Sequence, residues 1–449
     1  MLKKAVVAGL FASTLAVAGF AQEGPAPKGI PHLDHVFVIM MENHGYQQVI
    51  NNPNEPYLNS LIENKQVNLA TNYFAVGHPS LTNYLEIVGG SNFGVRSDNP
   101  PAWGSTSCSP NIATGLPNVD NNLGNSFTPP KPPPIPADSA SAICPIAGSG
   151  KDADTPAVDT WNETTPGVFN YLADIDGVKL VPAASVFGKT IADQLFSVGK
   201  SWKSYQESLP LGPVFKVNYS NGTASNLTNF GPLTPLMSGN VVQAYAVKHN
   251  PFAYFKDVQD GNGLENIVGF DGPNGLYADL ATDNVPTFSF ITPNQCNDQH
   301  GRGNADAFCA FDPGLTGNGG YTAGTQEGLN PGLILQGDTT IERLVTAITS
   351  SRVWCEGRNA IVIVWDENDY SGTPNAQQGL FPSQNQNQVV LTVQTNHGRA
   401  GVKSGNYYNS FSLLKSIEAG FRLPCLNHAC DSNVAVMSDL FGRDGDDDE

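Results

Sequence analysis

The stretch His35-Val36-Phe37-Val38-Ile39-Met40-Met41-Glu42-Asn43-His44-Gly45-Tyr46 places six consecutive apolar residues directly before a polar cluster. An apolar run of this length with β-branched residues predicts a strand buried on both faces, as in a parallel sheet. Ligands bind at the carboxyl ends of the strands in open α/β sheets. Because Glu42 and Asn43 follow the run and carry hard oxygen atoms, we expect them to bind a divalent cation. The alternative is a polar strand-to-loop transition without chemistry.

The same pattern, an apolar run followed by polar side chains, occurs twice more. The two runs are residues 286–293, before Asp298 and His300, and residues 360–365, before Asp366 and Glu367. A helix is expected between them, so strand, helix and strand form a βαβ unit. We therefore expect an α/β fold with a mostly parallel central sheet, helices on both faces and long loop insertions.

Periodicity predicts the remaining elements. Helices are expected at 56–65, 79–89, 190–198, 338–350, 407–419 and 433–440, strands at 67–69, 202–205 and 389–393, and insertions at 91–158 and 205–284. We find no internal repeat and no convincing boundary within the chain. The polar clusters near its two ends therefore belong to one domain, expected over residues 22–441.

Ser80 stands in the first turn of the helix that is expected to end at Gly89. Free backbone N–H groups and the helix dipole favour a bound anion at such a position. The alternative is that Ser80 only caps the helix, which is the commoner task of a serine there. Further along, Lys248 and His249 form a pair of cation-capable donors, although such a pair is most often plain surface.

The chain has 449 residues and a formal net charge of -18. This charge argues against a nucleic-acid partner, because binding a phosphate backbone needs clustered Lys and Arg. It would also repel an anionic substrate at long range, unless a bound metal reverses the local charge. The acidic segment 442–449 is expected to be a solvated tail rather than a calcium site, since it lacks the spacing of a calcium loop.

The amino terminus begins Met1-Leu2-Lys3-Lys4 and continues with a short apolar run and small residues. This pattern predicts a secretory signal peptide over residues 1–21 rather than a membrane span. No later run approaches the length of a transmembrane helix. The mature protein is expected to be secreted or periplasmic, with no transmembrane anchor. The sequence does not predict its oligomeric state.

Seven cysteines and predicted export make disulfides plausible, and their spacings do not fit a zinc knuckle. Proximity favours the pairs Cys425 with Cys430, Cys296 with Cys309, and Cys108 with Cys144, although sequence alone does not fix the connectivity. Cys355 is left over, directly before a predicted buried strand. There a free thiol is expected to behave as a small hydrophobic side chain.

Together, the three strand ends and the helix start supply a divalent-metal site, a hydroxyl nucleophile and imidazole donors. These are the groups needed for displacement of an oxygen at phosphorus. Serine proteolysis fits poorly, because Ser80 is not surrounded by a G-x-S-x-G turn. The residues therefore indicate phosphoryl transfer to water.

Five blocks in the same order also resemble a known family. They are Met41-Glu42-Asn43-His44, His78-Pro79-Ser80-Leu81-Thr82-Asn83-Tyr84, Lys248-His249-Asn250-Pro251, Trp365-Asp366-Glu367-Asn368-Asp369 and Ser412-Leu413-Leu414-Lys415-Ser416-Ile417-Glu418. They look like the phosphoesterase family that includes bacterial and fungal acid phosphatases and phosphatidylcholine-type phospholipases C. The resemblance implies an alkaline-phosphatase-like α/β fold.

The resemblance also implies roles for individual residues. Ser80 would be the nucleophile, Asn83 a donor to the transferred phosphoryl oxygens, and His249 and His300 would bind phosphate or handle the leaving group. The implied metal ligands are Glu42, Asn43, Asp366 and Glu367. Their oxygen atoms suit Ca²⁺, Mg²⁺ or Mn²⁺ and do not exclude Zn²⁺.

Two positions depart from the family pattern, since Gly104 and Ser410 stand where relatives commonly carry His. Both bear on substrate contacts or activity. The twin-Arg leader and appended β-domains of many phospholipase members do not occur, which favours an acid phosphatase acting on small phosphomonoesters through a phosphoserine. A phospholipase C-like phosphodiesterase is the first alternative, and an exported binding protein without catalysis is the second.

Overall fold

The structure is a computed structural model in which the main described segments are residues 23–77, 80–95, 98, 100–101, 143–150, 186–210, 244–302, 309–312, 328–368 and 387–442. Short strand segments are also described at 163–165, 168–169, 174–175, 178–179, 234–235 and 241–242. The predicted signal peptide, Cys108, Gly104 and residues 443–449 of the acidic segment lie outside the described residues.

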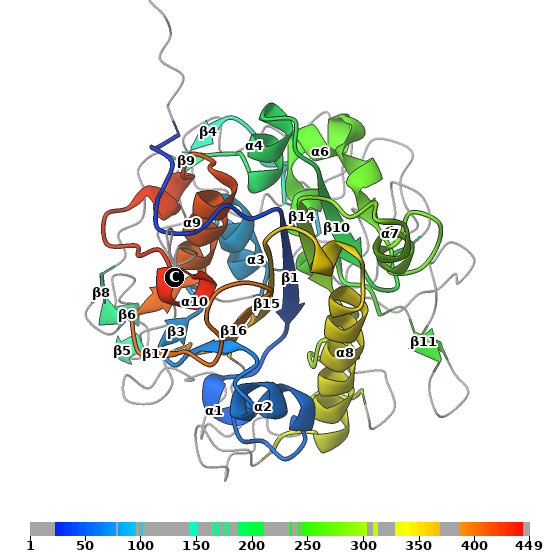
Figure 1. The fold of residues 1–449 in the computed structure, drawn as a ribbon. Helices are drawn as coiled ribbons and strands as arrows, with labels where there is room; N and C mark the ends of the chain where they lie inside the picture. Colours follow the sequence, from blue (N-terminus) through cyan, green and yellow to red (C-terminus); the bar gives the residue numbers. More distant parts are fainter. Residues whose placement is uncertain are drawn as a thin grey trace, which may run out of the picture.

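An eight-stranded sheet forms the centre of the molecule (Figure 1). Its order is β13 (Ile267–Val268), β10 (Trp202–Gln206), β14 (Phe288–Thr292), β1 (His35–Met41), β15 (Asn359–Trp365), β16 (Leu391–Thr395), β2 (Asn68–Ala70) and β17 (Lys403–Ser404). Strands β13, β10, β14, β1 and β15 are mutually parallel, whereas β16 runs antiparallel to β15 and β2. The predicted α/β class with a mostly parallel sheet is confirmed.

Strand β1 lies between β14 and β15 and is the strand on which the sheet is built. Its apolar residues from Val36 to Met41 are completely buried. Each such side chain contributes on the order of 1.5–3 kcal/mol to folding through burial. Because both neighbours run parallel to β1, the residues that follow the three strands emerge at the same edge of the sheet.

Helices cover both sides of this sheet. In Figure 1, α3 (Ser80–Gly89) and α9 (Ser410–Phe421) lie on one side of β1, and α8 (Pro331–Thr349) lies on the other. Helix α3 packs on α9, and α2 (Pro56–Glu63) packs on α8. The further helices are α1 (Tyr46–Val49), α4 (Ile191–Ser197), α6 (Lys256–Asp260), α7 (Leu276–Thr282) and α10 (Ser438–Phe441).

Shorter elements complete the described part. The 3-10 helices are η4 (Val247–His249), η5 (Pro251–Tyr254), η6 (Asn262–Asn266), η8 (Val353–Cys355) and η10 (Asn427–Cys430). The two-stranded pairs are β3 (Tyr73–Phe74) with β18 (Tyr408–Asn409), β4 (Ser149–Gly150) with β9 (Val186–Phe187), β5 (Glu163–Thr165) with β6 (Val168–Phe169), β7 (Asp174–Ile175) with β8 (Val178–Lys179), and β11 (Thr234–Pro235) with β12 (Val241–Val242). None of the helices in the described segments has the length and apolar character needed to cross a membrane.

Helix α8 begins seven residues before the expected start at Asp338. The Asn330 side chain caps it by accepting hydrogen bonds from Gly332 and Leu333. Gly337 has a low helix propensity, so the sequence gives little indication that the helix extends to residues before Asp338. The structure explains this glycine, because a Cβ atom there would collide with the Gln299 side chain.

The last expected helix, 433–440, is wrong in extent, since only α10 is helical there. The segment before α10 finds its hydrogen-bond partners on α9 instead. Lys415 Nζ donates to the carbonyls of Asp431 and Val434, and the Met437 N–H donates to Ser416 Oγ. Backbone groups satisfied in this way no longer need helical hydrogen bonds.

Three further expectations need correction. Residues 205–284 were expected as an insertion, but β13, α6, α7 and three 3-10 helices lie within them, and β13 extends the sheet. The strand expected at 389–393 occupies 391–395. Cys355 is a free thiol, as expected, but it is exposed rather than packed as a small hydrophobic side chain. The disulfides Cys296–Cys309 and Cys425–Cys430 are confirmed.

Candidate active site

The polar residues that follow β1, β14 and β15 meet at the carboxyl edge of the sheet. The Glu42 N–H donates to the Asp298 carbonyl at 2.8 Å, and the Asp366 N–H donates to the Met41 carbonyl at 3.0 Å. These backbone hydrogen bonds continue the sheet past the strand ends. Glu42, Asp298 and Asp366 are thereby held side by side, and all three are buried.

Ser80, the first residue of α3, faces this cluster. Its hydroxyl lies 3.2 Å from Glu42 Oε2 and 3.1 Å from Glu367 Oε1, and it donates to these carboxylates. Lys248 Nζ approaches the same hydroxyl oxygen at 3.5 Å. The hydroxyl is therefore placed between proton acceptors and a cation, and its hydrogen bonds go to other segments rather than to the N–H groups of its own helix.

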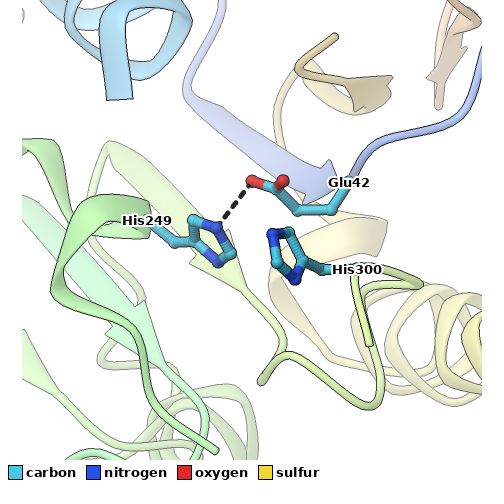
Figure 2. Close-up of side chains that lie close together, drawn as sticks. All are labelled: Glu42, His249 and His300. Carbon is cyan, nitrogen blue, oxygen red and sulfur yellow. Dashed lines mark ion pairs between the residues drawn. The ribbon is translucent and has the colours of Figure 1, made fainter. Parts of the chain in front are cut away.

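The His249 imidazole points toward the Glu42 carboxylate (Figure 2), and the Asp298 carboxylate faces its other ring nitrogen. Its Nε2 is 3.0 Å from Glu42 Oε1, and its Nδ1 is 3.2 Å from Asp298 Oδ2. The Tyr84 ring stacks on the imidazole at 5.3 Å and 6°. A proton on Nδ1, facing Asp298, leaves a lone pair on Nε2 that faces a second lone pair on Glu42. Such an arrangement is stabilised by a cation between the two atoms.

His300 and Lys248 form a second pair of donors beside Ser80. His300 Nδ1 donates to the Gly301 carbonyl at 2.9 Å, which leaves Nε2 as the acceptor for Lys248 Nζ at 3.0 Å. Lys248 also pairs with Asp98 Oδ2 at 3.0 Å. Asp98 Oδ1 in turn accepts the N–H of Leu81 in the first turn of α3. Lys248 is thus tied to the helix that carries Ser80.

Burial dominates the electrostatics of the site. It raises the pKa of Glu42 and of Asp366 well above their ordinary values, and the neighbouring carboxyl groups add to the effect. Burial also lowers the pKa of His249 and of His300, as does the positive charge of Lys248. Both imidazoles are therefore neutral, which is the form that binds a metal.

Burial opposes the charged form of Lys248, but the carboxylates of Asp98 and Glu42 outweigh it and raise the pKa of its ammonium group. In the described part of the chain, the Lys248 ammonium group is the positive charge that acts on the carboxyl groups of Glu42, Asp298, Asp366 and Glu367. The excess of carboxyl groups in a buried space favours an additional bound cation.

Within the described residues, four buried polar atoms at the site make no contact that meets hydrogen-bond geometry: Glu42 Oε1, His249 Nε2, Asp298 Oδ2 and Asp366 Oδ2. The approaches of His249 to Glu42 and Asp298 at 3.0 and 3.2 Å are ion-pair distances. Ligand atoms of Glu42, His249 and His300 lie within 4.8 Å of one another, a spacing that suits ligands around one ion. Unpartnered oxygen and nitrogen atoms of this kind fit a divalent metal. His249 and His300, expected as catalytic residues, thus also belong to the cluster that could hold it.

Asn43 was expected to bind the metal and Asn83 to donate to the phosphoryl oxygens, and both make hydrogen bonds within the site that restrict these roles. The Asn43 N–H donates to Asp366 Oδ1 at 3.0 Å, with Asn43 in the left-handed region at φ 63°. This hydrogen bond turns the other oxygen of Asp366 toward the site. The Asn83 amide nitrogen donates to the Gly77 carbonyl at 2.8 Å and to Glu367 Oε2 at 3.3 Å. A phosphoryl oxygen bound by Asn83 would have to compete with Glu367.

Sequence reasoning gave no role to Lys248, Asp98 or Tyr84 and named Asp298 only as part of a strand end. The Lys-His dipeptide was one available signal, although its ordinary interpretation is surface. No local sequence pattern identifies Asp98, because its partners Leu81 and Lys248 lie 17 and 150 residues away in the chain. Only the folded chain brings these groups to Ser80.

A family model described as the Phosphoesterase family matches residues 50–308. This stretch includes Ser80, Lys248, His249 and His300, whereas Glu42 and Asp366 lie outside it on either side. A probable acid phosphatase from Kluyveromyces lactis is 27% identical over 284 residues, covering 61% of this chain and 53% of that protein. The chain therefore spans about half the length of that relative.

A phosphatidylinositol-3-phosphatase from Mycobacterium tuberculosis is 22% identical over 443 residues, covering 98% of this chain and 93% of that protein. Among solved structures, a protein of the alkaline phosphatase superfamily from Vibrio parahaemolyticus aligns with a TM-score of 0.40 and 11% identity. That alignment covers 91% of this chain and 72% of the other.

Proposed function

Because this chain belongs to the phosphoesterase family, whose model matches more than half of it, we propose that it is a metal-dependent hydrolase of phosphomonoesters. The proposed reaction proceeds through a phosphoserine at Ser80. The observation that carries the proposal is the environment of the Ser80 hydroxyl, which lies within 3.2 Å of two carboxylates and 3.5 Å from the Lys248 ammonium.

In the first step, Ser80 Oγ forms a bond to phosphorus and the bond from phosphorus to the ester oxygen breaks. The hydroxyl proton passes to Glu42 or Glu367, the two groups to which it is already hydrogen-bonded. Lys248 and the first turn of α3 stabilise the negative charge on the phosphoryl oxygens. The departing oxygen takes a proton from the Lys248 ammonium group, which lies between Ser80 and His300, and the carboxyl group that accepted the Ser80 proton returns one to Lys248. The first product is therefore an alcohol, and the site gains no net proton.

In the second step, water attacks phosphorus and the Ser80 oxygen departs, taking back one proton. The sum is one ester and one water converted to one alcohol and one inorganic phosphate. Asn83 would orient the phosphoryl group during both steps, after exchange of its hydrogen bond with Glu367.

The residues fit a divalent metal held by Glu42 and Asp366 together with His249, with Asn43, Glu367 and His300 adjacent. When bound, such an ion neutralises the carboxyl groups and polarises the phosphoryl oxygens. The His249 imidazole among these ligands favours a transition-metal ion such as Zn²⁺ over Ca²⁺ or Mg²⁺.

The substrate is proposed to be a small phosphorylated compound. Support comes from two relatives, one named as a probable acid phosphatase and the other as a phosphatidylinositol-3-phosphatase. Export from the cytoplasm is also proposed. The two disulfides are compatible with an oxidising compartment.

The decisive experiment is Ser80→Ala, with inorganic phosphate release measured on a panel of monoesters and on phosphatidylcholine. We expect turnover to fall by at least about 10³-fold, as for loss of a nucleophile. We also expect wild-type protein, quenched in acid during turnover of a ³²P-labelled ester, to retain label on Ser80. If Ser80 only caps α3, the variant should lose about 0.5–2 kcal/mol of stability and keep its turnover.

Ser416→Ala is the matched control. Ser416 is equally buried in α9, where its hydroxyl donates to the Ser412 carbonyl. Its loss should lower stability without affecting turnover. A folded Ser80→Ala protein with wild-type turnover would end the nucleophile proposal. Head-group release from phosphatidylcholine in place of phosphate release from monoesters would support the phosphodiesterase alternative, and no release from any ester would support a binding protein.

A further inference from the structure

Phe311 is an exposed aromatic side chain that contacts the candidate active site. The large apolar side chains that are exposed in the described residues are Phe196, Val198, Phe311 and Leu335. Phe311 is 38% exposed, and its ring packs edge-on against His300 with the centroids 5.6 Å apart at 66°. Single exposed apolar residues are ordinary. This one is distinguished by its contact with a site imidazole.

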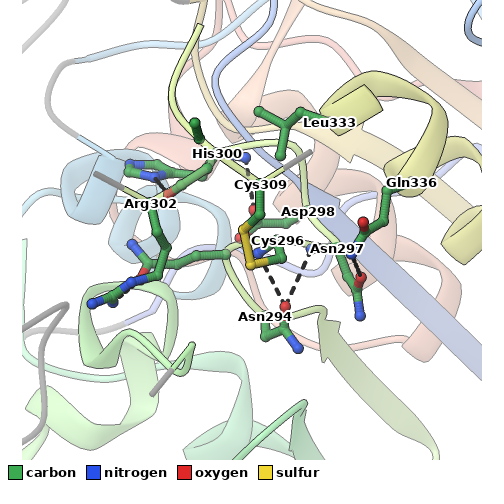
Figure 3. Close-up of a disulfide and its surroundings, with 12 residues drawn as sticks. Asn294, Cys296, Asn297, Asp298, His300, Arg302, Cys309, Leu333 and Gln336 are labelled. Carbon is green, nitrogen blue, oxygen red and sulfur yellow. Dashed lines mark hydrogen bonds between the residues drawn. A yellow bond between two sulfur atoms is a disulfide. The ribbon is translucent and has the colours of Figure 1, made fainter. Parts of the chain in front are cut away.

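The backbone on both sides of Phe311 is anchored. Cys309, two residues before it, is joined to Cys296 by a disulfide whose Cα atoms lie 5.0 Å apart (Figure 3). Asp312, the next residue, accepts a hydrogen bond from His44 Nε2 at 2.7 Å and another from the backbone N–H of Asn330. With these anchors, the exposed ring is held in place beside His300.

The contacts that lead outward from Ser80 end at this ring. Ser80 Oγ is 3.5 Å from Lys248 Nζ, Lys248 Nζ is 3.0 Å from His300 Nε2, and His300 packs against Phe311. In an in-line displacement the leaving group departs on the side of phosphorus opposite to the attacking oxygen. The organic part of the ester therefore lies on the side away from Ser80, and the contacts that lead outward from Ser80 place His300 and then Phe311 there as candidate neighbours.

We propose that Phe311 forms the surface on which the leaving group packs, and that the preferred substrates are aryl phosphates, in which an aromatic ring carries the ester oxygen. This inference rests on the proposed phosphomonoesterase function. Aromatic rings attract one another at centroid distances of about 4.5–7 Å. Such a contact needs no charge on the leaving group, so the ester carries only the charge of its phosphate toward a chain of net charge -18.

The test compares phenyl phosphate with glycerol 2-phosphate, which lacks a ring, in wild type and in Phe311→Ala. We expect kcat/KM for phenyl phosphate to fall by about tenfold in the variant. For glycerol 2-phosphate we expect a change of less than about twofold, because no aromatic contact is lost. Phe311→Tyr should keep the preference for phenyl phosphate, and Phe311→Leu should lose it.

Phe196→Ala is the matched control, since Phe196 is 82% exposed on α4 and should leave both substrates unaffected. Melting temperatures of all variants check folding. Equal losses on both substrates would overturn the inference, because Phe311 would then only support His300, and so would an unchanged preference in Phe311→Ala or Phe311→Leu. Absence of phosphate release from both esters by wild-type protein would instead remove the proposed function, and this inference with it.

Discussion

The indole Nε1–H of Trp365 donates a hydrogen bond of 2.9 Å to Oε1 of Gln299. Trp365 ends β15 directly before Asp366, and Gln299 lies between Asp298 and His300. The Gln299 amide nitrogen also donates to the Ile334 carbonyl at 3.1 Å and to Glu55. One buried side chain thereby connects the two loops that carry most of the site to helix α8.

We predict that Gln299→Leu lowers kcat by about 10²-fold, because a displacement of about 1 Å in a positioned group has effects of this size. The KM should change little, since the hydrogen bonds of the Gln299 side chain go to Trp365, Ile334 and Glu55 and not to Ser80. Steady-state kinetics with a monoester would measure both constants.

Gln336→Leu is the control for this prediction. Gln336 Nε2 donates to Asn297 in the same loop at 2.6 Å, but on the outer side. Gln336→Leu should lower the free energy of unfolding and leave kcat unchanged. A Gln299→Leu protein that is destabilised yet fully active would show that Gln299 has no positioning role.

Lys248→Met should weaken binding of the phosphoryl group. A hydrogen bond to a charged group contributes about 1.5–3 kcal/mol, so inhibition by inorganic phosphate should weaken by roughly 10- to 150-fold. Lys203→Met provides a comparison, because Lys203 pairs with Asp279 at 2.5 Å away from Ser80. Phosphate inhibition constants of both variants measure the effect. Equal constants for Lys248→Met and wild type would exclude contact between Lys248 and phosphate.

If the proposed metal is bound, its removal should lower both activity and melting temperature. Without a cation, the carboxyl groups of Glu42, Asp366 and Asp298 remain buried beside one another with raised pKa values. Dialysis against a strong chelator, followed by addition of Zn²⁺, Mn²⁺, Mg²⁺ or Ca²⁺, should identify the ion by recovery of the melting temperature. In Glu42→Gln that recovery should be much smaller. A melting temperature and a turnover that do not respond to chelation would refute the metal site.

Glu55 gives a prediction about pH and stability. Burial, and next the neighbouring Asp338 carboxyl, raise the pKa of Glu55 well above its ordinary value of 4.5. The folded protein then binds more protons than the unfolded chain between the unfolded and the folded pKa, so the free energy of unfolding falls as pH rises through this window. Below the unfolded pKa the contribution of Glu55 is fully present.

Glu55→Gln removes this titration. The free energy of unfolding of the variant, relative to wild type, should therefore increase with pH. Urea unfolding at a series of pH values from about 4 to about 8 measures the difference. A difference that does not change with pH would show that Glu55 has the same pKa in both states.

The sequence by itself determined the strand that organises the sheet and the residues that follow it. Strand β1 is predicted by its local sequence pattern, because a strand that is buried on both faces consists almost entirely of apolar residues. Glu42, Asp298 and Asp366 follow three such runs, and parallel strands bring their carboxyl ends to one edge. Ser80 was found in the same way, from a proline, a helical pattern and a terminal glycine. The family resemblance added roles for Ser80, Glu42 and Asp366, but none for Asp298.

The tertiary structure decided which side chains meet at that edge. Lys248 contacts Ser80 across 168 residues, Asp98 contacts Lys248 across 150, and Gln299 contacts Trp365 across 66. Such contacts depend on how loops and helices pack, and no local periodicity encodes them. Long-range packing also sets the direction of the Gln299 side chain, the start of α8 seven residues early and the exposure of Phe311. Local pattern fixes where a strand ends, whereas the groups that surround that end are selected by long-range packing.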